Sequence, residues 1–417
     1  RDPELPPKDA TVRSVPAYPS KRSTTGTSAI TLEDMKKVAD AHTTFPEGFS
    51  VHPKVMPQLQ RRATAIAQGP IDWATGEILA LGSLLLEGRT VRLTGQDTRR
   101  GTFAQRFAAI VDRKTGESWV PLKHLDDEQG KFHVFDTLLS EYAAMGFEYG
   151  YSVARPDALV LWEAQFGDFA NGAQTIIDEY IASGEAKWTQ KSGVVLLLPH
   201  GLEGQGPDHS SARLERFLLL AAEEAFVVAQ PSTPASYFHL LRRHALNERH
   251  RPVIVATPKS MLRNKLATSM PDEFTSGSWL PVLADPTVTD PAAVEKVLLC
   301  SGKVRWDLVT RRKQNGQDGK VAIIPVERLY PLPAQEIADA LARFENVTEV
   351  TWVQDEPANQ GAWPFMALNL PAALREAVPG RRWELLSVTR PASSAPSVGS
   401  AKVSEQQQKA MLDAAFA

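Results

Sequence analysis

Residues 193–216 read GVVLLLPHGLEGQGPDHSSARLER, an apolar run followed by a loop with three glycines and two histidines. A short apolar run without alternating polar residues is typical of a strand that is buried on both faces of a parallel sheet. Polar residues directly after such a strand lie at the edge of the sheet where open α/β proteins bind their ligands. The glycines indicate a loop of special backbone geometry, which presents His200 and His209 at that edge.

The same kind of apolar run recurs along the chain. Between residues 90 and 258 these runs alternate with helical patterns, as in a parallel sheet with crossover helices. After a Pro- and Asp-rich stretch at 284–293, a second alternating set follows. We therefore predict an α/β protein of two tandem domains with mostly parallel sheets. The predicted strands lie at 90–95, 158–163, 193–199, 225–231, 252–258, 294–302, 320–329, 348–357 and 382–391.

The domain organisation follows from these patterns. Residues 1–30 are rich in proline and lack apolar periodicity, which is typical of a linker or an extended arm. A helical lead-in at 31–88 follows, with helices near 32–42, 53–67 and 71–88. We place the first α/β domain at 89–283 and the second at 294–417, the second with helices near 303–314, 333–344 and 361–377.

The composition is that of an ordinary globular protein, and it excludes several functions. The 46 Lys and Arg residues nearly balance 49 Asp and Glu residues, so no overall charge attracts nucleic acid or an anionic membrane. No apolar run approaches the roughly 18 residues that a membrane span needs. Cys300 is the single cysteine, which excludes an intrachain disulfide and suits a reducing compartment. We expect a soluble, cytoplasmic protein without a nucleic-acid or membrane partner.

Several polar and aromatic residues at the predicted strand ends are candidates for a site, and each has an ordinary alternative. Glu141 begins a helix behind Ser140, where a carboxylate either stabilises the helix dipole or takes part in catalysis. His200 and His209 are either hydrogen-bonded loop residues or catalytic groups. Phe166 and Phe169 belong either to the core or to a stacking platform for a ligand.

Four long strings stand out at the predicted strand ends. They are DTLLSE (136–141), WEAQFGDFANGAQ (162–174), LLPHGLEGQGPDHSSARLERF (197–217) and DEPANQGAW (355–363). These strings resemble the thiamine diphosphate enzymes of the transketolase superfamily. In detail they are similar to the decarboxylating component of the 2-oxoglutarate dehydrogenase complex, and TRRGTF (98–103) is similar to the actinobacterial form. The resemblance implies a pyrimidine-binding domain at 89–283 and a transketolase C-terminal-like domain at 294–417.

The resemblance implies roles for individual residues. Glu141 would contact the pyrimidine 1′-nitrogen of the cofactor, where a shared carboxyl proton favours the tautomer that activates the cofactor. Phe169 would stack on the aminopyrimidine, and Leu139 would lie under the cofactor. The implied cofactor-binding residues are Leu139, Glu141, Phe166 and Phe169, and the implied catalytic residues are Glu141, His209, which would face the substrate, and His200.

Two departures from the family pattern stand beside this resemblance. Many relatives have Arg-His-Ala where this chain has Arg106, Phe107 and Ala108, so no contact of that histidine can be carried over. The chain also lacks the Gly-Asp-Gly and Asn-Asn motifs that bind the diphosphate and its Mg²⁺. We therefore expect half a cofactor site, with the diphosphate-binding domain upstream on the same polypeptide and a homodimer of that polypeptide.

The implied reaction is oxidative decarboxylation of 2-oxoglutarate with succinyl transfer to a lipoyl group, in the tricarboxylic acid cycle. The lipoyl group would belong to a succinyltransferase partner. Non-oxidative decarboxylation or carboligation, a 2-oxoadipate substrate, and a non-catalytic assembly or regulatory role all stay open. A basic cluster is either a solvated helix end or a site for an acyl-CoA effector; it consists of Arg242, Arg243, His244, Arg249, His250 and Arg251.

Overall fold

The computed structural model describes residues 27–417, which form two parallel sheets with helices around them. Most of the arm predicted at 1–30 lies outside the described residues. The α/β class and the mostly parallel sheets are confirmed, since among the named strands of the described part antiparallel pairing joins only β7 to β11 and β2 to β3. No helix in this part is long and apolar enough to span a membrane.

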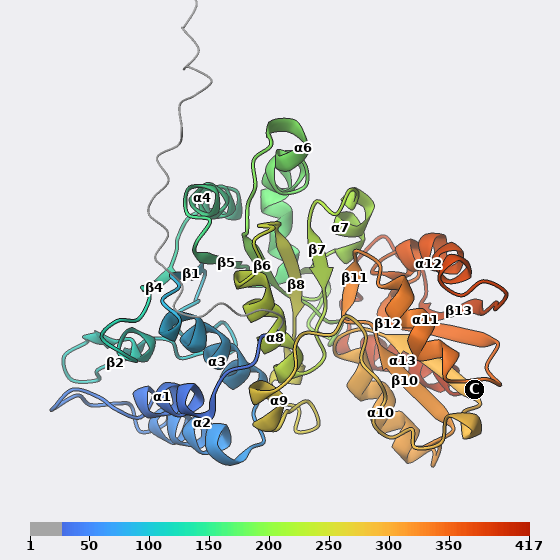
Figure 1. Cartoon of the computed structure of the whole chain (residues 1–417), viewed down its shortest axis with the longest axis horizontal. Coiled ribbons are helices and arrows are strands. Elements are labelled where there is room, and N and C mark those ends of the chain that lie inside the picture. Colours follow the sequence, from blue (N-terminus) through green and yellow to red (C-terminus); the bar gives the residue numbers. More distant parts are fainter. Residues whose placement is uncertain (1–26) are drawn as a thin grey trace, which may run out of the picture.

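The first sheet has seven strands in the order β11-β7-β8-β6-β5-β1-β4 and lies at the centre of the molecule (Figure 1). Each predicted apolar run between 90 and 258 forms one of its strands, whereas the parallel edge strand β4 was not predicted. The strands are β1 (Val91–Gly95), β4 (Phe132–Asp136), β5 (Leu159–Glu163), β6 (Val195–Pro199), β7 (Val227–Ala229), β8 (Val253–Thr257) and β11 (Arg328–Tyr330).

The second sheet has four parallel strands in the order β10-β9-β12-β13. They are β9 (Lys296–Cys300), β10 (Val321–Pro325), β12 (Glu349–Pro357) and β13 (Glu384–Arg390), and a small hairpin elsewhere consists of β2 (Ile110–Val111) and β3 (Ser118–Trp119). The prediction of one strand at 320–329 was wrong. The chain leaves the second sheet after Pro325 and returns as β11, which pairs with β7 in the first sheet.

Helices cover both sheets, and most of the predicted ones are present. Nearly every residue of α3 is buried, and α3 packs against α8 beneath the first sheet, so part of the lead-in shares the core of that sheet. The longer helices are α1 (Leu32–Ala41), α2 (Met56–Gln68), α3 (Trp73–Leu86), α4 (Glu141–Ala154), α7 (Leu214–Leu220), α8 (Pro234–Ala245), α10 (Val304–Gln314), α11 (Ala334–Ala342), α12 (Trp363–Ala377) and α13 (Ala401–Ala415). Shorter ones are α5 (Gln174–Ile176), α6 (Gly184–Trp188) and α9 (Asp272–Thr275).

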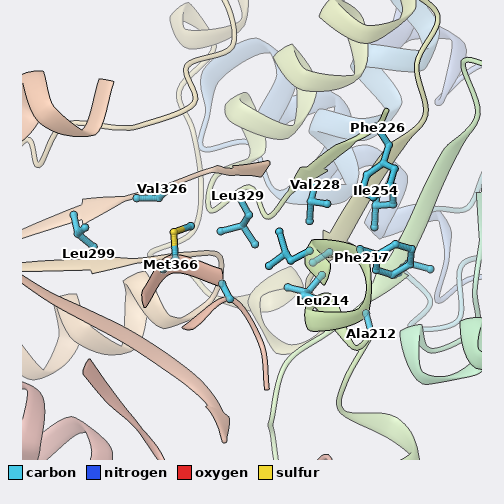
Figure 2. Packing of buried hydrophobic residues seen from close by; sticks show 14 of the residues in the cluster. Ala212, Leu214, Phe217, Phe226, Val228, Ile254, Leu299, Val326, Leu329 and Met366 are labelled. Atoms are coloured by element: carbon cyan, nitrogen blue, oxygen red, sulfur yellow. The ribbon is translucent and has the colours of Figure 1, made fainter. Parts of the chain in front are cut away.

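One hydrophobic core continues from the first sheet into the second domain. Figure 2 shows Val228 and Ile254 of the first sheet, Leu329 of β11, and Met366 of α12 as members of a single cluster. All four side chains are fully buried. Because burial of apolar area is the main favourable contribution to folding, this shared cluster holds the two domains in a fixed relation.

Candidate active site

The candidate residues lie where the parallel strands of the first sheet end. β1, β5, β6 and β8 run in the same direction, so their carboxyl ends meet at one edge of the sheet. The loop at 164–174 follows β5, the histidine loop (residues 200–211) follows β6, and Lys259 follows β8. This is the edge at which open α/β sheets bind ligands.

Glu141 is the first residue of α4, and residues 137–140 connect this helix to the end of β4. Ser140 caps this helix, because its hydroxyl accepts a hydrogen bond from the Ala143 amide at 3.3 Å. Gln96 donates to Glu141 Oε1 at 3.4 Å, and Oε2 has no hydrogen-bond partner in the described residues. A Cβ on Gly172 would lie 3.3 Å from Oε2, so glycine keeps the space beside this oxygen open.

The loop after β5, which contacts α4, contributes Phe166 and Phe169 to an aromatic cluster. The cluster consists of Phe103, Phe166, Phe169 and His209, and its rings meet edge to face. The centroids of Phe166 and His209 are 4.5 Å apart, and those of Phe169 and His209 are 5.9 Å apart. Phe166, Phe169 and His209 are all half-buried, so each keeps part of its ring accessible from solvent.

The histidine loop has the unusual backbone that its glycines predict. Gly201, Gly204 and Gly206 have φ values of 145°, 77° and 89°, which L side chains rarely adopt. Asp168 fixes the end of the loop, because its Oδ1 accepts hydrogen bonds from the amides of Ser210 and Ser211 at 3.1 and 3.0 Å. The position of His209 therefore depends on a buried carboxylate of the preceding loop.

Lys259 also holds the histidine loop, and the sequence did not predict it. Its Nζ donates to Gln205 Oε1 at 2.6 Å and to the carbonyl oxygen of His209, and it lies 5.9 Å from the Phe166 ring centroid. The side chain is buried, and burial lowers the pKa of its ammonium group. The sequence signal was its position directly after the apolar run 252–258.

His200 lies apart from the aromatic cluster and is completely buried. The Ala212 amide donates to its Nδ1 at 3.0 Å, so Nε2 carries the ring hydrogen and donates to Glu356 Oε1 at 2.8 Å. Burial opposes a charge on this ring, but Glu356 outweighs that effect and raises the pKa of His200. The ring therefore faces the second domain.

The partners of His200 form a buried charged group at the end of β12. Burial and the neighbouring Asp355 carboxylate raise the pKa of Glu356. Burial also works against ionisation of Asp355, but Lys303 and then His200 outweigh it and lower the pKa of Asp355 to about 2. His200, Asp355 and Glu356 have ligand atoms within 4.8 Å of one another, yet hydrogen bonds and the Lys303 ammonium already satisfy those atoms.

Leu139 lies on an open apolar face in front of Glu141. Leu139 and Tyr142 are about half exposed, and Leu138 is fully exposed. Exposed apolar groups of this size, gathered at one place, are typical of a surface that another protein element covers. The candidate site is thus an open face of the described residues.

A buried ion network supports the loop that carries Gln96 and Phe103. Arg106 forms paired hydrogen bonds with Glu77 and with Glu163, at 2.6–3.2 Å, and all three side chains are almost fully buried. Tyr237 donates to Glu77 at 2.9 Å. Phe107 has a positive φ of 51° and is half-buried.

The basic cluster is mostly paired within the protein. Arg242 is fully buried and binds Glu87, Ser83 and the carbonyl oxygen of Ser28. In the same cluster, Arg243 donates to the Trp279 carbonyl oxygen. Further ion pairs and hydrogen bonds join His244 to Gly193, Arg249 to Glu224, and Arg251 to Glu185 and Glu224.

Comparisons with known proteins identify two domain families in this chain. The transketolase pyrimidine-binding domain matches residues 69–265, and the 2-oxoglutarate dehydrogenase C-terminal domain matches residues 268–416. The chain is 52% identical, over 99% of its length, to 33% of a multifunctional 2-oxoglutarate metabolism enzyme of Mycobacterium sp. (strain JLS). It is 53% identical, over 93% of its length, to 32% of a 2-oxoglutarate dehydrogenase E1/E2 component of Corynebacterium glutamicum.

The chain thus spans about a third of the length of the curated relatives it matches. The two matched domains cover both sheets, with the boundary between them at 265–268. The chain therefore carries a transketolase pyrimidine-binding domain followed by a 2-oxoglutarate dehydrogenase C-terminal domain.

Proposed function

We propose that this chain supplies the pyrimidine-facing half of a thiamine diphosphate site, in an enzyme that oxidatively decarboxylates 2-oxoglutarate and transfers the succinyl group to a lipoyl group. The observation that carries the proposal is the placement of Glu141. Its carboxylate starts α4 with no hydrogen bond to Oε2 from residues 27–417, beside the space that Gly172 leaves open and next to the loop of Phe169.

The residues of this face fit the cofactor that the family implies. When bound, thiamine diphosphate supplies the electron sink that loss of carbon dioxide from a 2-oxo acid requires. Glu141 Oε2 would hold a proton against the pyrimidine nitrogen, while Gln96 orients the other carboxylate oxygen. Phe169 and Phe166 offer half-buried rings for stacking, and Leu139 offers an exposed apolar side chain to pack under the cofactor.

His209 is the proposed substrate-facing residue. It lies at the rim of the aromatic cluster, with its backbone carbonyl held by Lys259 and its ring packed against Phe166. From that position a ring nitrogen would hydrogen-bond a substrate carboxylate or assist a proton transfer. His200 takes a different part in the proposal, because its buried ring cannot reach a ligand and acts through its contacts with Ala212 and Glu356.

The other half of the site is proposed to come from a diphosphate-binding domain upstream on the same polypeptide, which would hold Mg²⁺. The exposed face around Leu138, Leu139 and Tyr142 supports this proposal, because an apolar surface there needs a cover. A homodimer of the complete polypeptide would place each pyrimidine-facing half against a diphosphate-binding half. The single cysteine, Cys300, suits a reducing compartment, and the cytoplasm is the proposed location.

A lipoyl-bearing succinyltransferase is the proposed acceptor of the acyl group. The name of the Corynebacterium glutamicum relative joins an E1 and an E2 component, which supports this partner. Two alternatives stay separable by experiment. Product analysis with and without a lipoyl acceptor distinguishes oxidative transfer from non-oxidative decarboxylation or carboligation. A non-catalytic assembly or regulatory role predicts no turnover after reconstitution with the diphosphate-binding domain.

The proposal is tested by substitution of Glu141 in the assembled enzyme, meaning this chain together with its diphosphate-binding domain. Intact mass and thiamine diphosphate content first establish that the assembled enzyme is present. We expect Glu141→Gln to lower turnover of 2-oxoglutarate about 100-fold or more, because the group that shares the proton is lost. Glu33→Gln is the matched control, since Glu33 is also a first-turn carboxylate but lies on α1. Equal activity of the two variants would overturn the proposal.

A further inference from the structure

Three residues of the second domain form hydrogen bonds with the start of the histidine loop. Asp355 Oδ2 accepts a hydrogen bond from the Leu202 amide at 3.1 Å. Arg390 donates to the carbonyl oxygen of the same Leu202 at 3.2 Å. Glu356 accepts the Nε2 hydrogen of His200 at 2.8 Å. The amide and the carbonyl group of Leu202 and the side chain of His200 are thus all hydrogen-bonded to the second domain. Each partner lies more than 150 positions away in the sequence.

These three residues, which we call the clamp (Asp355, Glu356 and Arg390), sit on rigid elements. Asp355 and Glu356 lie near the end of β12, and Arg390 is the last residue of the neighbouring strand β13. Each is at most 4% exposed. Arg390 is held in turn by Ser404 and Gln408 of α13, so the clamp cannot shift without the second sheet and its helix.

The opposite side of the histidine loop is held by the first domain. Ser260 donates to Glu203, Lys259 donates to Gln205, and Asp168 accepts from Ser210. The histidine loop is therefore held by hydrogen bonds from both domains, and the clamp supplies those from the second domain. A loop whose glycines permit many backbone conformations takes one conformation when both of its sides are bound.

We infer that the clamp makes the second domain a positioning element for the histidine loop, and so for the direction in which His209 points. The contacts stand on the geometry alone, whereas their consequence for catalysis rests on the proposed function. The clamp residues touch neither the aromatic cluster nor Glu141 directly, so they are positioning residues that act through Leu202 and His200. No catalytic chemistry is assigned to them.

Hydrogen–deuterium exchange on the 417-residue chain tests the contacts directly, because individual amides report each one. The Leu202 amide reports Asp355, and the Ala212 amide reports the position of His200. We expect Asp355→Ala to accelerate exchange at Leu202 about tenfold, because its acceptor is lost. Asp355→Asn keeps an acceptor oxygen and should show a smaller effect.

Asp285→Ala is the matched control, because Asp285 is also a buried carboxylate and accepts a backbone hydrogen bond, from Ile323. This control should accelerate exchange at Ile323 and leave Leu202 unchanged. Glu356→Ala should accelerate exchange at Ala212, whereas Glu356→Gln keeps an oxygen for the His200 Nε2 hydrogen and should not. Unchanged exchange at both Leu202 and Ala212 in the alanine variants would overturn the inference, as would an equal change at Leu202 in the control.

Kinetics of the assembled enzyme test the consequence. We expect Asp355→Ala to lower kcat/KM for 2-oxoglutarate about tenfold while thiamine diphosphate content stays at the wild-type level, and Asp355→Asn to recover part of the loss. If Asp355→Ala accelerates exchange at Leu202 but has wild-type kinetics, the clamp does not orient His209 for catalysis. If the wild-type enzyme has no thiamine-dependent turnover, the proposed function fails, and the exchange results still decide whether the clamp holds the loop.

Discussion

The ring of His209 stands edge-on against the ring of Phe166, with the centroids 4.5 Å apart and the ring planes at 86°. Edge-to-face pairs of this geometry contribute about 0.5–1.5 kcal/mol beyond the area that they bury. Phe166 in turn contacts Phe103 and Phe169, so the ring of His209 packs against a connected set of aromatic rings. The orientation of His209 therefore depends on a residue that has no polar group of its own.

Replacement of Phe166 by leucine should disturb His209 without removing it. The aliphatic side chain cannot present a ring face to the imidazole, so we expect kcat/KM for 2-oxoglutarate to fall about tenfold in the assembled enzyme. Phe103→Leu is the control, because Phe103 contacts Phe166 but no ring pairing joins it to His209. Steady-state kinetics of both variants measure the difference, and a loss confined to Phe103→Leu would contradict the prediction.

Lys259 should tolerate substitution poorly, because its ammonium group joins Gln205 and the His209 carbonyl oxygen. In Lys259→Met the side chain keeps a similar length, but two acceptors lose their donor. We expect kcat/KM to fall about tenfold, with the thermal unfolding temperature changed by only a few degrees, because methionine also removes a buried charge. A variant with wild-type kinetics and reduced stability would assign Lys259 a purely structural role.

The raised pKa of Glu356 predicts a pH-dependent stability. A group whose pKa is higher in the folded state than its ordinary value of 4.5 stabilises the fold below that value, and the contribution is lost as pH rises through the folded pKa. Glu356→Gln cannot lose a proton, so we expect its unfolding temperature to exceed that of the wild type increasingly as pH rises above about 4.5. Thermal unfolding of both proteins from pH 5 to 8 measures this gap. A difference in unfolding temperature that stays constant with pH would contradict the raised pKa of Glu356.

Arg106 should be among the residues most costly to replace. Removal of its guanidinium leaves the Glu77 and Glu163 carboxylates buried without a cation. We expect Arg106→Met to lower the free energy of unfolding by about 3–5 kcal/mol. Arg100→Met should lower it by less than about 0.5 kcal/mol, because Arg100 is exposed and makes a 3.6 Å ion pair with Asp97 and a 3.3 Å hydrogen bond to the carbonyl oxygen of its neighbour Gly101. Urea unfolding followed by circular dichroism compares the two.

The basic cluster separates into a structural arginine and a candidate effector contact. Arg242 is buried against Glu87, so Arg242→Ala should destabilise the protein by about 3 kcal/mol or more. Arg243→Ala should leave stability nearly unchanged and abolish any response of turnover to an acyl-CoA effector that binds at this helix end. Turnover measured with and without acetyl-CoA decides the point, since an unaltered response in Arg243→Ala would remove the effector site.

The sequence predicted the strands well because burial on both faces gives each one an unbroken apolar run, as in VVLLLP at 194–199. It missed β4, because this edge strand alternates buried and partly exposed residues and ends in the exposed Phe135 and Asp136. It also merged β10 and β11. Local pattern cannot show that Val326 and Glu327 mark a passage from one sheet to another, since that depends on which strands lie nearby.

The sequence predicted those residues of the candidate site that stand beside a local sequence signal, such as a helix cap or a group of glycines. Glu141 follows a helix cap, and the glycines of the histidine loop mark its backbone. Lys259 and the clamp were missed, although Glu356 lies in a string that resembles the family. Their importance arises from contacts across the fold, such as that of Glu356 with His200, 156 residues earlier. Composition and periodicity carry no information on such contacts.

The strand β11 has a consequence for any attempt to divide the protein. Its three residues cover the backbone of β7, which would otherwise end the first sheet with unpaired amide and carbonyl groups. A fragment cut in the stretch at 284–293 would leave that strand open, together with the apolar surface that Leu329 covers. Open strand edges of this kind form backbone hydrogen bonds with strands of other molecules. The isolated first domain should therefore self-associate and precipitate. The C-terminal third of the chain thus protects the first two thirds from aggregation.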